Sequence, residues 1–249
     1  MPTVGVEFAK VSYTLPDEHV LLRDISLRLE AGTTTALLGR SGSGKTTLLR
    51  MVNGLARPSD GEVLVDGFSV NNCNIATLRG SIGYVIQETG LFPHMTVERN
   101  AGLALELAGR SKGEIAARAA EVLALVGLDF AEFRGRYPWQ LSGGQRQRVG
   151  VARALAMDPA VLLMDEPFGA LDPLTRAEMQ TMLRGLLARV GKTVLLVTHD
   201  LDEALYLAER VVFLAGGAVV ADLPAREVLH SENSHVKDYV QAVHRTVQA

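Results

Sequence analysis

A glycine-rich stretch from Gly39 to Thr47, with the sequence GRSGSGKTT, holds the residues best suited to chemistry. It fits the pattern G-x-x-x-x-G-K-[ST], which Lys45 and Thr46 complete. Such a loop in front of a helix aims several backbone N–H groups into one concavity, where the helix dipole also favours negative charge. Lys45 would reach the β- and γ-phosphates of a nucleotide, and the Thr46 hydroxyl would bind magnesium. The stretch therefore predicts a nucleoside triphosphate site.

The segments on either side of this loop have the patterns of a strand and a helix. Thr34–Leu38 is a short apolar run of strand length, and Thr47–Asn53 carries apolar residues at helical spacing. Gly39, Gly42 and Gly44 allow the tight backbone bends between them. The order of strand, loop and helix favours a phosphate site over the alternative, a flexible Gly/Ser turn with a solvated lysine.

A second group of reactive side chains follows two other apolar runs. Val161–Glu166 ends in two carboxylates, of which Asp165 is suited to support magnesium. Glu166 would point to the opposite side and polarise a water molecule as general base, and the alternative is a solvated acidic turn. His199 follows the apolar run Lys192–Thr198, and ligands of open α/β sheets bind at the carboxyl ends of the strands.

Three further positions have two interpretations each. Gln87 follows the run Ile82–Ile86 and could bind magnesium through its amide oxygen or hold a water, but by itself an ordinary loop residue is favoured. Tyr13 could stack on a flat ligand base, although spacing alone favours a core aromatic. Ser142 and the amides of Gly143–Gly144 could form a second anion site at a helix start, or Ser142 could be an N-cap only.

The surrounding elements indicate an α/β protein. Val4–Tyr13 and Leu21–Glu30 alternate as half-buried antiparallel strands do. Between residues 91 and 158 the apolar residues take helical spacing, with a capping box at Ser111–Glu114, which predicts a helical insertion. Asp172 is expected to cap a helix that begins at Pro173. The chain is expected to close with a hairpin and two short helices, at Arg210–Leu214, Ala218–Asp222, Pro224–His230 and His235–Val247.

Composition narrows the class of protein. The 249 residues include 25 Lys and Arg against 28 Asp and Glu, a net charge of -3 that gives no support to nucleic-acid binding. The single cysteine, Cys73, cannot form an intrachain disulfide, which suits a reducing compartment. No signal peptide is visible, and every apolar run is shorter than the roughly 18 residues that span a bilayer. A protein that is soluble when isolated is expected.

Taken together, the motifs resemble those of the ATPase subunit of ATP-binding cassette (ABC) transporters over essentially the whole chain. The matching motifs, in chain order, are GRSGSGKT at Gly39–Thr46, Gln87, LSGGQ at Leu141–Gln145, VLLMDEP at Val161–Pro167, GALD at Gly169–Asp172 and His199. The resemblance implies one nucleotide-binding domain over residues 1–249. Its P-loop NTPase (RecA-like) core and antiparallel β subdomain would span about 1–87 and 159–249, and an inserted α-helical signature subdomain about 88–158.

The resemblance also implies a role for each matching residue. ATP would be bound by Tyr13, Gly39, Arg40, Ser41, Gly42, Ser43, Gly44, Lys45, Thr46 and Thr47. Tyr13 then stacks on adenine, which reverses the preference from spacing. Magnesium would be held by Thr46, Gln87 and Asp165, and hydrolysis would depend on Lys45, Gln87, Glu166 and His199. ATP on a second copy would be contacted by Ser142, Gly143, Gly144, Gln145 and Asp172.

The partners implied by the resemblance are a second ATPase subunit, in an ATP-dependent homodimer, and integral membrane permease subunits that contact the surface around Gln87–Val97. A substrate-binding protein would act indirectly, and no nucleic acid is expected. The protein would work at the cytoplasmic face of the membrane. The cycle would couple ATP hydrolysis to closing and reopening of the dimer.

A narrower resemblance points to importers of quaternary-amine osmoprotectants such as glycine betaine, choline and carnitine. It is carried by Ile82–Asn100, Tyr137–Leu155 and the tail from His230 to Val240. Many members of that group carry regulatory CBS domains after the cassette, and because the sequence ends at Ala249 such regulation is not expected. The alternatives are an importer of amino acids or another small solute, or an ABC-type ATPase of DNA repair, translation or cofactor assembly. A P-loop kinase would leave LSGGQ and His199 without a purpose.

Overall fold

The computed structural model describes residues 5–244, and its backbone contacts divide this part of the chain into two compact units. The first unit combines residues 5–78 with 193–244, and the second is Arg79–Lys192. The short helix α2 (Ile75–Gly80) contains the point at which the chain passes from the first unit to the second. The predicted α/β class is confirmed, whereas the predicted subdomain boundaries near residues 87 and 159 stay a prediction.

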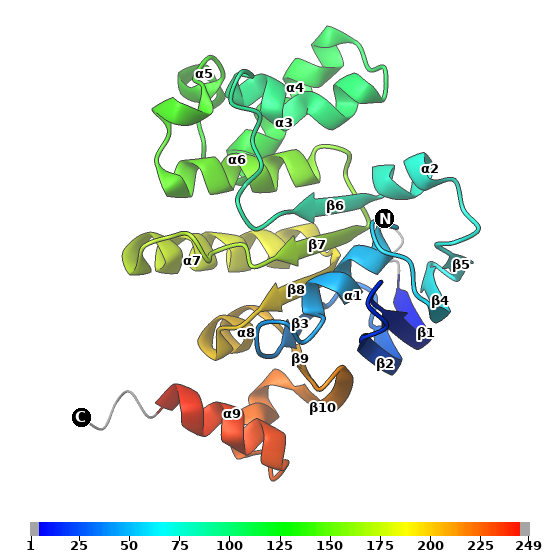
Figure 1. Cartoon of the computed structure of the whole chain (residues 1–249). Helices are drawn as coiled ribbons and strands as arrows, with labels where there is room; N and C mark the ends of the chain where they lie inside the picture. The colour runs from blue at the N-terminus through cyan, green and yellow to red at the C-terminus, as the bar shows by residue number, and fades with distance from the viewer. Residues whose placement is uncertain (1–4, 245–249) are drawn as a thin grey trace. The chain divides into compact units, whose positions relative to one another are not determined.

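The first unit contains an antiparallel sheet in the strand order β2-β1-β4-β5 (Figure 1). Its strands are β1 (Val6–Thr14), β2 (Val20–Leu29), β4 (Asp60–Val65) and β5 (Phe68–Ser69). Alternate side chains of β1, among them Val6 and Phe8, are buried, as the alternating sequence predicts. The sheet is therefore covered on one face only.

The first unit also contains parallel strands that deliver the phosphate loop. Strand β3 (Thr34–Leu38) lies between β8 (Thr193–Thr198) and β9 (Arg210–Ala215) and runs parallel to both, and β10 (Ala218–Pro224) is antiparallel to β9. Every residue of β3 and β8 is buried, because strands covered on both faces read as continuous apolar runs. The helices of this unit are α1 (Lys45–Val52), α8 (Leu201–Leu207), the 3-10 segment Ala225–His230 and α9 (Ser234–His244). Residues 245–247, predicted to continue the last helix, lie outside the described residues.

The second unit pairs two parallel strands, β6 (Ile82–Val85) and β7 (Val161–Asp165), and is otherwise helical. Its helices are α3 (Val97–Leu107), α4 (Lys112–Leu125), α5 (Phe130–Phe133), the 3-10 segment Pro138–Gln140, α6 (Gly143–Leu155) and α7 (Pro173–Val190). Helix α6 packs on α3, α4, α7 and β6. Two predicted helix starts are confirmed, since Ser111 and Glu114 form a capping box at α4 and Asp172 caps α7.

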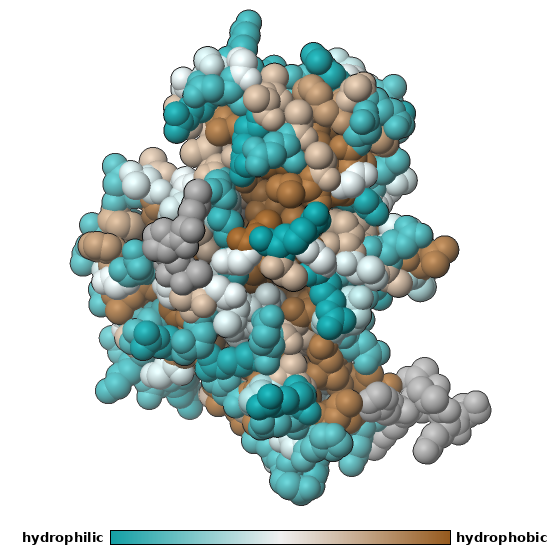
Figure 2. Space-filling model, turned by 180° about the vertical axis from the view of Figure 1, so that it is seen from behind, coloured by the Kyte–Doolittle hydropathy of each residue, from teal (hydrophilic) through white to brown (hydrophobic). Residues whose placement is uncertain are grey.

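The surface is mixed in character. Figure 2 shows hydrophobic residues reaching the surface in patches among hydrophilic ones. The exposed large hydrophobic side chains include Phe68, Leu107 and Trp139. Among the helices within residues 5–244, none has both the length and the apolar character needed to cross a membrane.

Candidate functional site

The phosphate loop joins the end of β3 to the start of α1. Gly44 takes the N-cap position of α1 with a φ of 95°, and no side chain within residues 5–244 caps the helix start. The backbone N–H groups of the first turn are therefore not covered by a capping side chain and can bind an anion. A Cβ atom on Gly44 would lie 2.5 Å from Leu22 Cδ2, so the loop needs glycine there for both space and backbone shape.

Two polar side-chain groups of the loop are buried, and both could bind a phosphate group. Lys45 is only 5% exposed, and its Nζ donates hydrogen bonds to the carbonyls of Gly39 at 2.7 Å and Arg40 at 3.0 Å. The Oγ of Ser43 is buried and has no hydrogen-bond partner in the described part of the chain. A buried hydroxyl left without a partner costs about 1–3 kcal/mol, and a phosphate oxygen would supply the missing bond.

His199 leaves the sheet beside the phosphate loop. In the parallel pair β3–β8, Leu38 is in register with Thr198, so Gly39 and His199 emerge next to one another at the carboxyl ends of these strands. The His199 side chain is exposed, whereas Thr198 before it is 2% exposed. The structure therefore brings together two of the motifs that the sequence separates by more than 150 residues.

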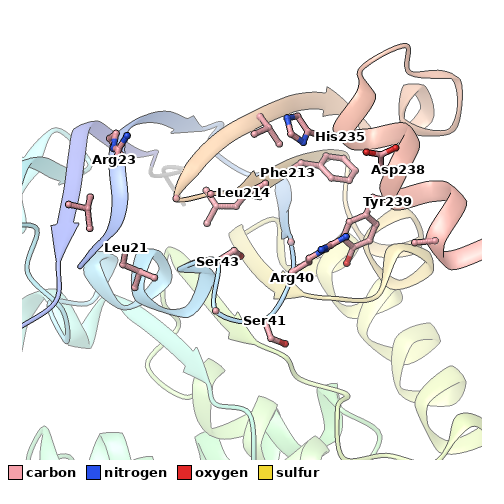
Figure 3. A pocket seen from close by; sticks show the side chains of 18 of the residues that line it. Leu21, Arg23, Arg40, Ser41, Ser43, Phe213, Leu214, His235, Asp238 and Tyr239 are labelled. Atoms are coloured by element: carbon pink, nitrogen blue, oxygen red, sulfur yellow. The ribbon is translucent and has the colours of Figure 1, made fainter. Parts of the chain in front are cut away.

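A cavity of about 940 Å³ lies on one side of the phosphate loop (Figure 3). The loop residues Gly39 to Ser43 form one wall, and the β9–β10 turn and one face of α9 form others. Arg40 and Tyr239 both line it. Tyr13, Lys45 and Thr46 do not line this cavity. Tyr13 is half-buried in β1, opposite Leu22 of β2, and its stacking on adenine stays a prediction.

The acidic pair of the second unit lies at the carboxyl end of β7. Asp165 is 2% exposed, and its Oδ2 accepts a hydrogen bond from the Tyr84 hydroxyl at 3.4 Å. Glu166 takes a left-handed backbone conformation with φ 44°, which turns the chain sharply after the strand. The Nε2 of Gln87 donates to Glu166 Oε2 at 3.3 Å. Gln87 and Glu166 meet because β6 and β7 are parallel, so both strands deliver their following residues to the same edge.

The loop after Gln87 is held by side chains that sequence reasoning missed. Arg153, on α6, donates from Nη1 to the carbonyl of Gly90 and from Nη2 to that of Thr89, each at 2.7 Å. Burial lowers the pKa of Arg153. Both loop residues have positive φ, 57° for Thr89 and 53° for Gly90, which aims their carbonyls at one guanidinium. The contact ties α6, which begins within the LSGGQ motif, to the loop that follows Gln87.

Asn100 organises the next part of the same loop. It is fully buried at 0% exposure. Its Oδ1 accepts from Phe92 N at 2.8 Å, and its Nδ2 donates to the carbonyls of Phe92, Met95 and Thr96 at 3.0–3.1 Å. One amide side chain thus replaces the regular hydrogen bonds that an irregular segment lacks. The signal available in the sequence was an Asn among the apolar residues of a helical segment.

The LSGGQ motif forms the start of α6. Ser142 Oγ accepts from Gln145 N at 3.2 Å, and Gln145 Oε1 accepts from Ser142 N at 2.9 Å, which is a complete capping box. The N-cap interpretation of Ser142 is therefore confirmed, and its hydroxyl still has a donor proton for an anion. A Cβ atom on Gly144 would lie 2.7 Å from Thr175 Cγ2, so α6 approaches α7 closely here.

Asp172 begins α7 as predicted, accepting from Thr175 N at 3.0 Å. Hydrogen bonds from Thr175, from its side chain first and then its backbone, lower the pKa of Asp172. The predicted contacts of Ser142, Gly143, Gly144, Gln145 and Asp172 with ATP on a second copy stay a prediction.

The residues proposed for magnesium are oxygen donors, which is what a hard divalent cation prefers. Thr46 offers a hydroxyl at the second position of α1, Gln87 an exposed amide and Asp165 a buried carboxylate. Within residues 5–244, no cluster of three or more His, Cys, Asp or Glu side chains could hold a metal. Each of these ligands by itself suits magnesium that is bound partly by protein oxygens and partly by phosphates.

The sequence matches the family described as ABC transporter over residues 22–169. The chain is 46% identical over 206 residues to the osmoprotectant import ATP-binding protein OsmV of Salmonella typhimurium, covering 83% of this chain and 54% of that protein. It is 47% identical over 218 residues to the sulfate/thiosulfate import ATP-binding protein CysA of Nocardia farcinica, covering 84% of this chain and 65% of that one. The chain thus spans between half and two thirds of the length of these relatives.

A solved structure matches over most of the chain. It is a dimeric post-hydrolysis state of the ATP-binding cassette MJ0796 bound to ADP and Pi, with a TM-score of 0.78 and 35% identity. The match covers 89% of this chain and 99% of that one.

Proposed function

The chain belongs to the ABC transporter family, and we propose that it is the ATP-hydrolysing subunit that powers an importer of quaternary-amine osmoprotectants. The observation that carries the proposal is the phosphate loop. Three features of the described residues together favour a bound triphosphate: a helix start that they leave uncapped, a buried lysine, and a buried serine hydroxyl without a partner among them. The name of the relative OsmV and the osmoprotectant-like stretches of the sequence support the class of solute.

Each side chain has a task in the proposed reaction. Lys45 and the α1 amides bind the phosphates, and His199 contacts the γ-phosphate from the adjacent strand end. Glu166 accepts a proton from the attacking water, and Gln87, which donates to Glu166, orients that water. Thr46, Gln87 and Asp165 would hold magnesium, which would supply charge neutralisation for the phosphates.

Hydrolysis by the purified chain tests the enzymatic part of the proposal. We expect magnesium-dependent release of phosphate from ATP, lost in Lys45→Ala. In Glu166→Gln, which removes the general base but keeps a similar shape, we expect ATP binding to persist and turnover to fall roughly 10²- to 10⁴-fold. Wild-type turnover in Glu166→Gln would remove Glu166 from its role.

A test of the proposed transport role requires the membrane permease. We propose that the protein works at the cytoplasmic face of the membrane. The tagged Glu166→Gln variant, loaded with ATP, is therefore expected to co-purify with a polytopic permease from gently solubilised membranes. Wild-type chain reconstituted with that permease should then hydrolyse ATP faster with glycine betaine, choline or carnitine. A response to sulfate or to an amino acid instead would select the second candidate, an importer of another small solute, which the identity to CysA favours. Repeated recovery of soluble or nucleic-acid partners alone would overturn the transporter role.

A further inference from the structure

Helix α9 is attached to the first unit through one face. Val236 is 1% exposed, and Tyr239, Val240 and Val243 pack against the same core. That core includes buried residues of β3, α8 and β9, among them Leu38 and Phe213. The adjoining edge of α9 lines the cavity beside the phosphate loop, with His235, Asp238 and Tyr239 (Figure 3). Helix α9 therefore adjoins both the sheet that delivers His199 and the loop that is proposed to bind ATP.

Tyr239 makes the most specific contact of α9. Its hydroxyl donates a hydrogen bond to the backbone carbonyl of His199 at 2.7 Å. Its ring meets Phe213 edge to face, with centroids 5.8 Å apart and planes at 77°. Phe213 in turn is in register with Leu38, the last residue before the phosphate loop. The packing of the ring thus fixes the hydroxyl on the carbonyl of His199.

With the Tyr239 hydrogen bond, the peptide plane between His199 and Asp200 is held at both ends. The plane between His199 and Asp200 has two polar ends, the carbonyl of His199 and the N–H of Asp200. The carbonyl accepts from Tyr239, and the N–H donates to Thr198 Oγ1 at 3.0 Å. Asp200 is also held as the N-cap of α8, because its Oδ1 accepts from Glu203 N at 3.1 Å. Hydrogen bonds at both ends of this peptide plane fix the ψ angle of His199. They therefore also fix the direction of the Cα–Cβ bond that carries the imidazole.

We propose that Tyr239 is a positioning residue for His199, so that α9 sets the orientation of the imidazole during ATP hydrolysis. This rests on the proposed function, in which His199 contacts the γ-phosphate. Tyr239 acts through the backbone of His199 and needs no contact with the nucleotide. Loss of its hydroxyl releases one end of the peptide plane, which lowers the fraction of time that the imidazole spends in the productive orientation.

Tyr239→Phe is the direct test, because it removes the hydroxyl and keeps the ring on Phe213. Loss of one positioning hydrogen bond should lower kcat roughly fivefold, with KM for ATP within about twofold of wild type. Val236→Ala is the matched control on the same helix. It removes buried apolar surface, so it should lower the thermal midpoint more than Tyr239→Phe while it lowers kcat less. The opposite order would mean that Tyr239 acts through stability only, and would overturn the proposal.

A double-mutant cycle separates action through His199 from any other route. In a His199→Ala background, Tyr239→Phe should change the slow residual phosphate release less than twofold, because the side chain it positions is gone. An undiminished fivefold effect in that background would contradict the proposal.

Side-chain NMR of histidine-labelled protein gives a readout that does not depend on turnover. The ring signals of His199, assigned by their loss in His199→Ala, should shift or broaden in Tyr239→Phe and stay unchanged in Val236→Ala. Unchanged His199 signals in Tyr239→Phe would overturn the inference even if the enzyme is active. Absence of hydrolysis by the wild-type chain, with the NMR change still present, would overturn the proposed function and leave the link between Tyr239 and His199 intact.

Discussion

The conformation of the phosphate loop depends on the small size of single residues as much as on their charges. Gly44 has a φ of 95° and stands against the side chain of Leu22, which belongs to the antiparallel sheet. The loop can therefore reach the start of α1 only without a Cβ atom at this position. Lys45 and Thr46, which follow, are placed by that approach.

Gly44→Ala is expected to disrupt the loop. Left-handed backbone costs a non-glycine residue about 1–2 kcal/mol, and the overlap with Leu22 adds about 1–3 kcal/mol. We expect a lower free energy of unfolding in urea and a loss of ATP binding of at least tenfold by calorimetry. Gly67→Ala is the matched control, since Gly67 has φ 76° and, apart from its chain neighbours, no atom of the described residues lies within 4 Å of the added Cβ. The Gly67→Ala variant should lose only the free energy of unfolding that left-handed backbone costs, and it should keep ATP binding. Equal effects of the two substitutions would contradict the steric argument.

Residues with short-range signals could be predicted from the sequence, and those with long-range partners could not. Ser111 and Glu114 are three positions apart and form the capping box that their spacing predicts. Tyr84, by contrast, bonds Asp165 across 81 positions, Arg153 bonds Thr89 across 64 and Tyr239 bonds His199 across 40. No periodicity in one chain reports such pairs, because only the finished fold brings them together.

At the level of elements, the strands were the most predictable part. Thr34–Leu38 was predicted with its observed ends, and the strand predicted at Lys192–Thr198 is observed at Thr193–Thr198, because buried parallel strands are continuous apolar runs. The two-residue β5 and the six-residue α2 were not predicted, since they are too short to show a period. What the sequence could not supply is register, and it is register that puts His199 beside the phosphate loop.

The link between α6 and the loop after Gln87 depends on the planar guanidinium of Arg153. Arg153→Lys keeps the charge but cannot bond the carbonyls of Thr89 and Gly90 in the same forked geometry. We expect faster hydrogen exchange in residues 87–91 and a fall in kcat of roughly threefold to tenfold. Arg148→Lys is the control, because Arg148 bonds one carbonyl, that of Val126, at 3.0 Å. If Arg148→Lys slows turnover as much as Arg153→Lys, the loop is not positioned by Arg153.

The start of α4 should give the protein an acid-sensitive helix cap. Hydrogen bonds from Ser111, from its hydroxyl first and then its backbone N–H, lower the pKa of Glu114 from its ordinary 4.5. A carboxylate with a lowered pKa stabilises the folded state above pH 4.5, and that contribution is lost as the pH falls through the folded value. The difference in free energy of unfolding between wild type and Glu114→Ala should therefore be constant near neutral pH and shrink below pH 4.5. A difference that grows on acidification would contradict the sign.

For the molecule as a whole, the proposed function requires two copies to close around ATP, and the capping box of α6 offers a way to test this without unfolding the helix. Asp and Asn both cap helices well, so Ser142→Asp and Ser142→Asn should preserve α6. In the Glu166→Gln background, we expect the Asn variant to double its mass on addition of ATP, measured by light scattering after gel filtration. The Asp variant should stay monomeric, because its carboxylate would repel the γ-phosphate of the partner's nucleotide. Equal dimerisation of both would exclude the LSGGQ motif from contact with ATP.

The hydrogen bonds that Lys45 makes to its own loop also affect the rates at which nucleotide would bind and leave in the proposed cycle. With Nζ at 2.7 Å from the carbonyl of Gly39 and 3.0 Å from that of Arg40, the ammonium is already in place when a nucleotide arrives. Entry is then a replacement, in which phosphate oxygens take over from two carbonyls, and no segment has to fold first. Dissociation of the product is the reverse process, because the two carbonyls can accept hydrogen bonds from the Lys45 ammonium again as the product leaves. In the proposed cycle, we therefore expect product to leave faster than from a loop whose lysine has no carbonyl to return to.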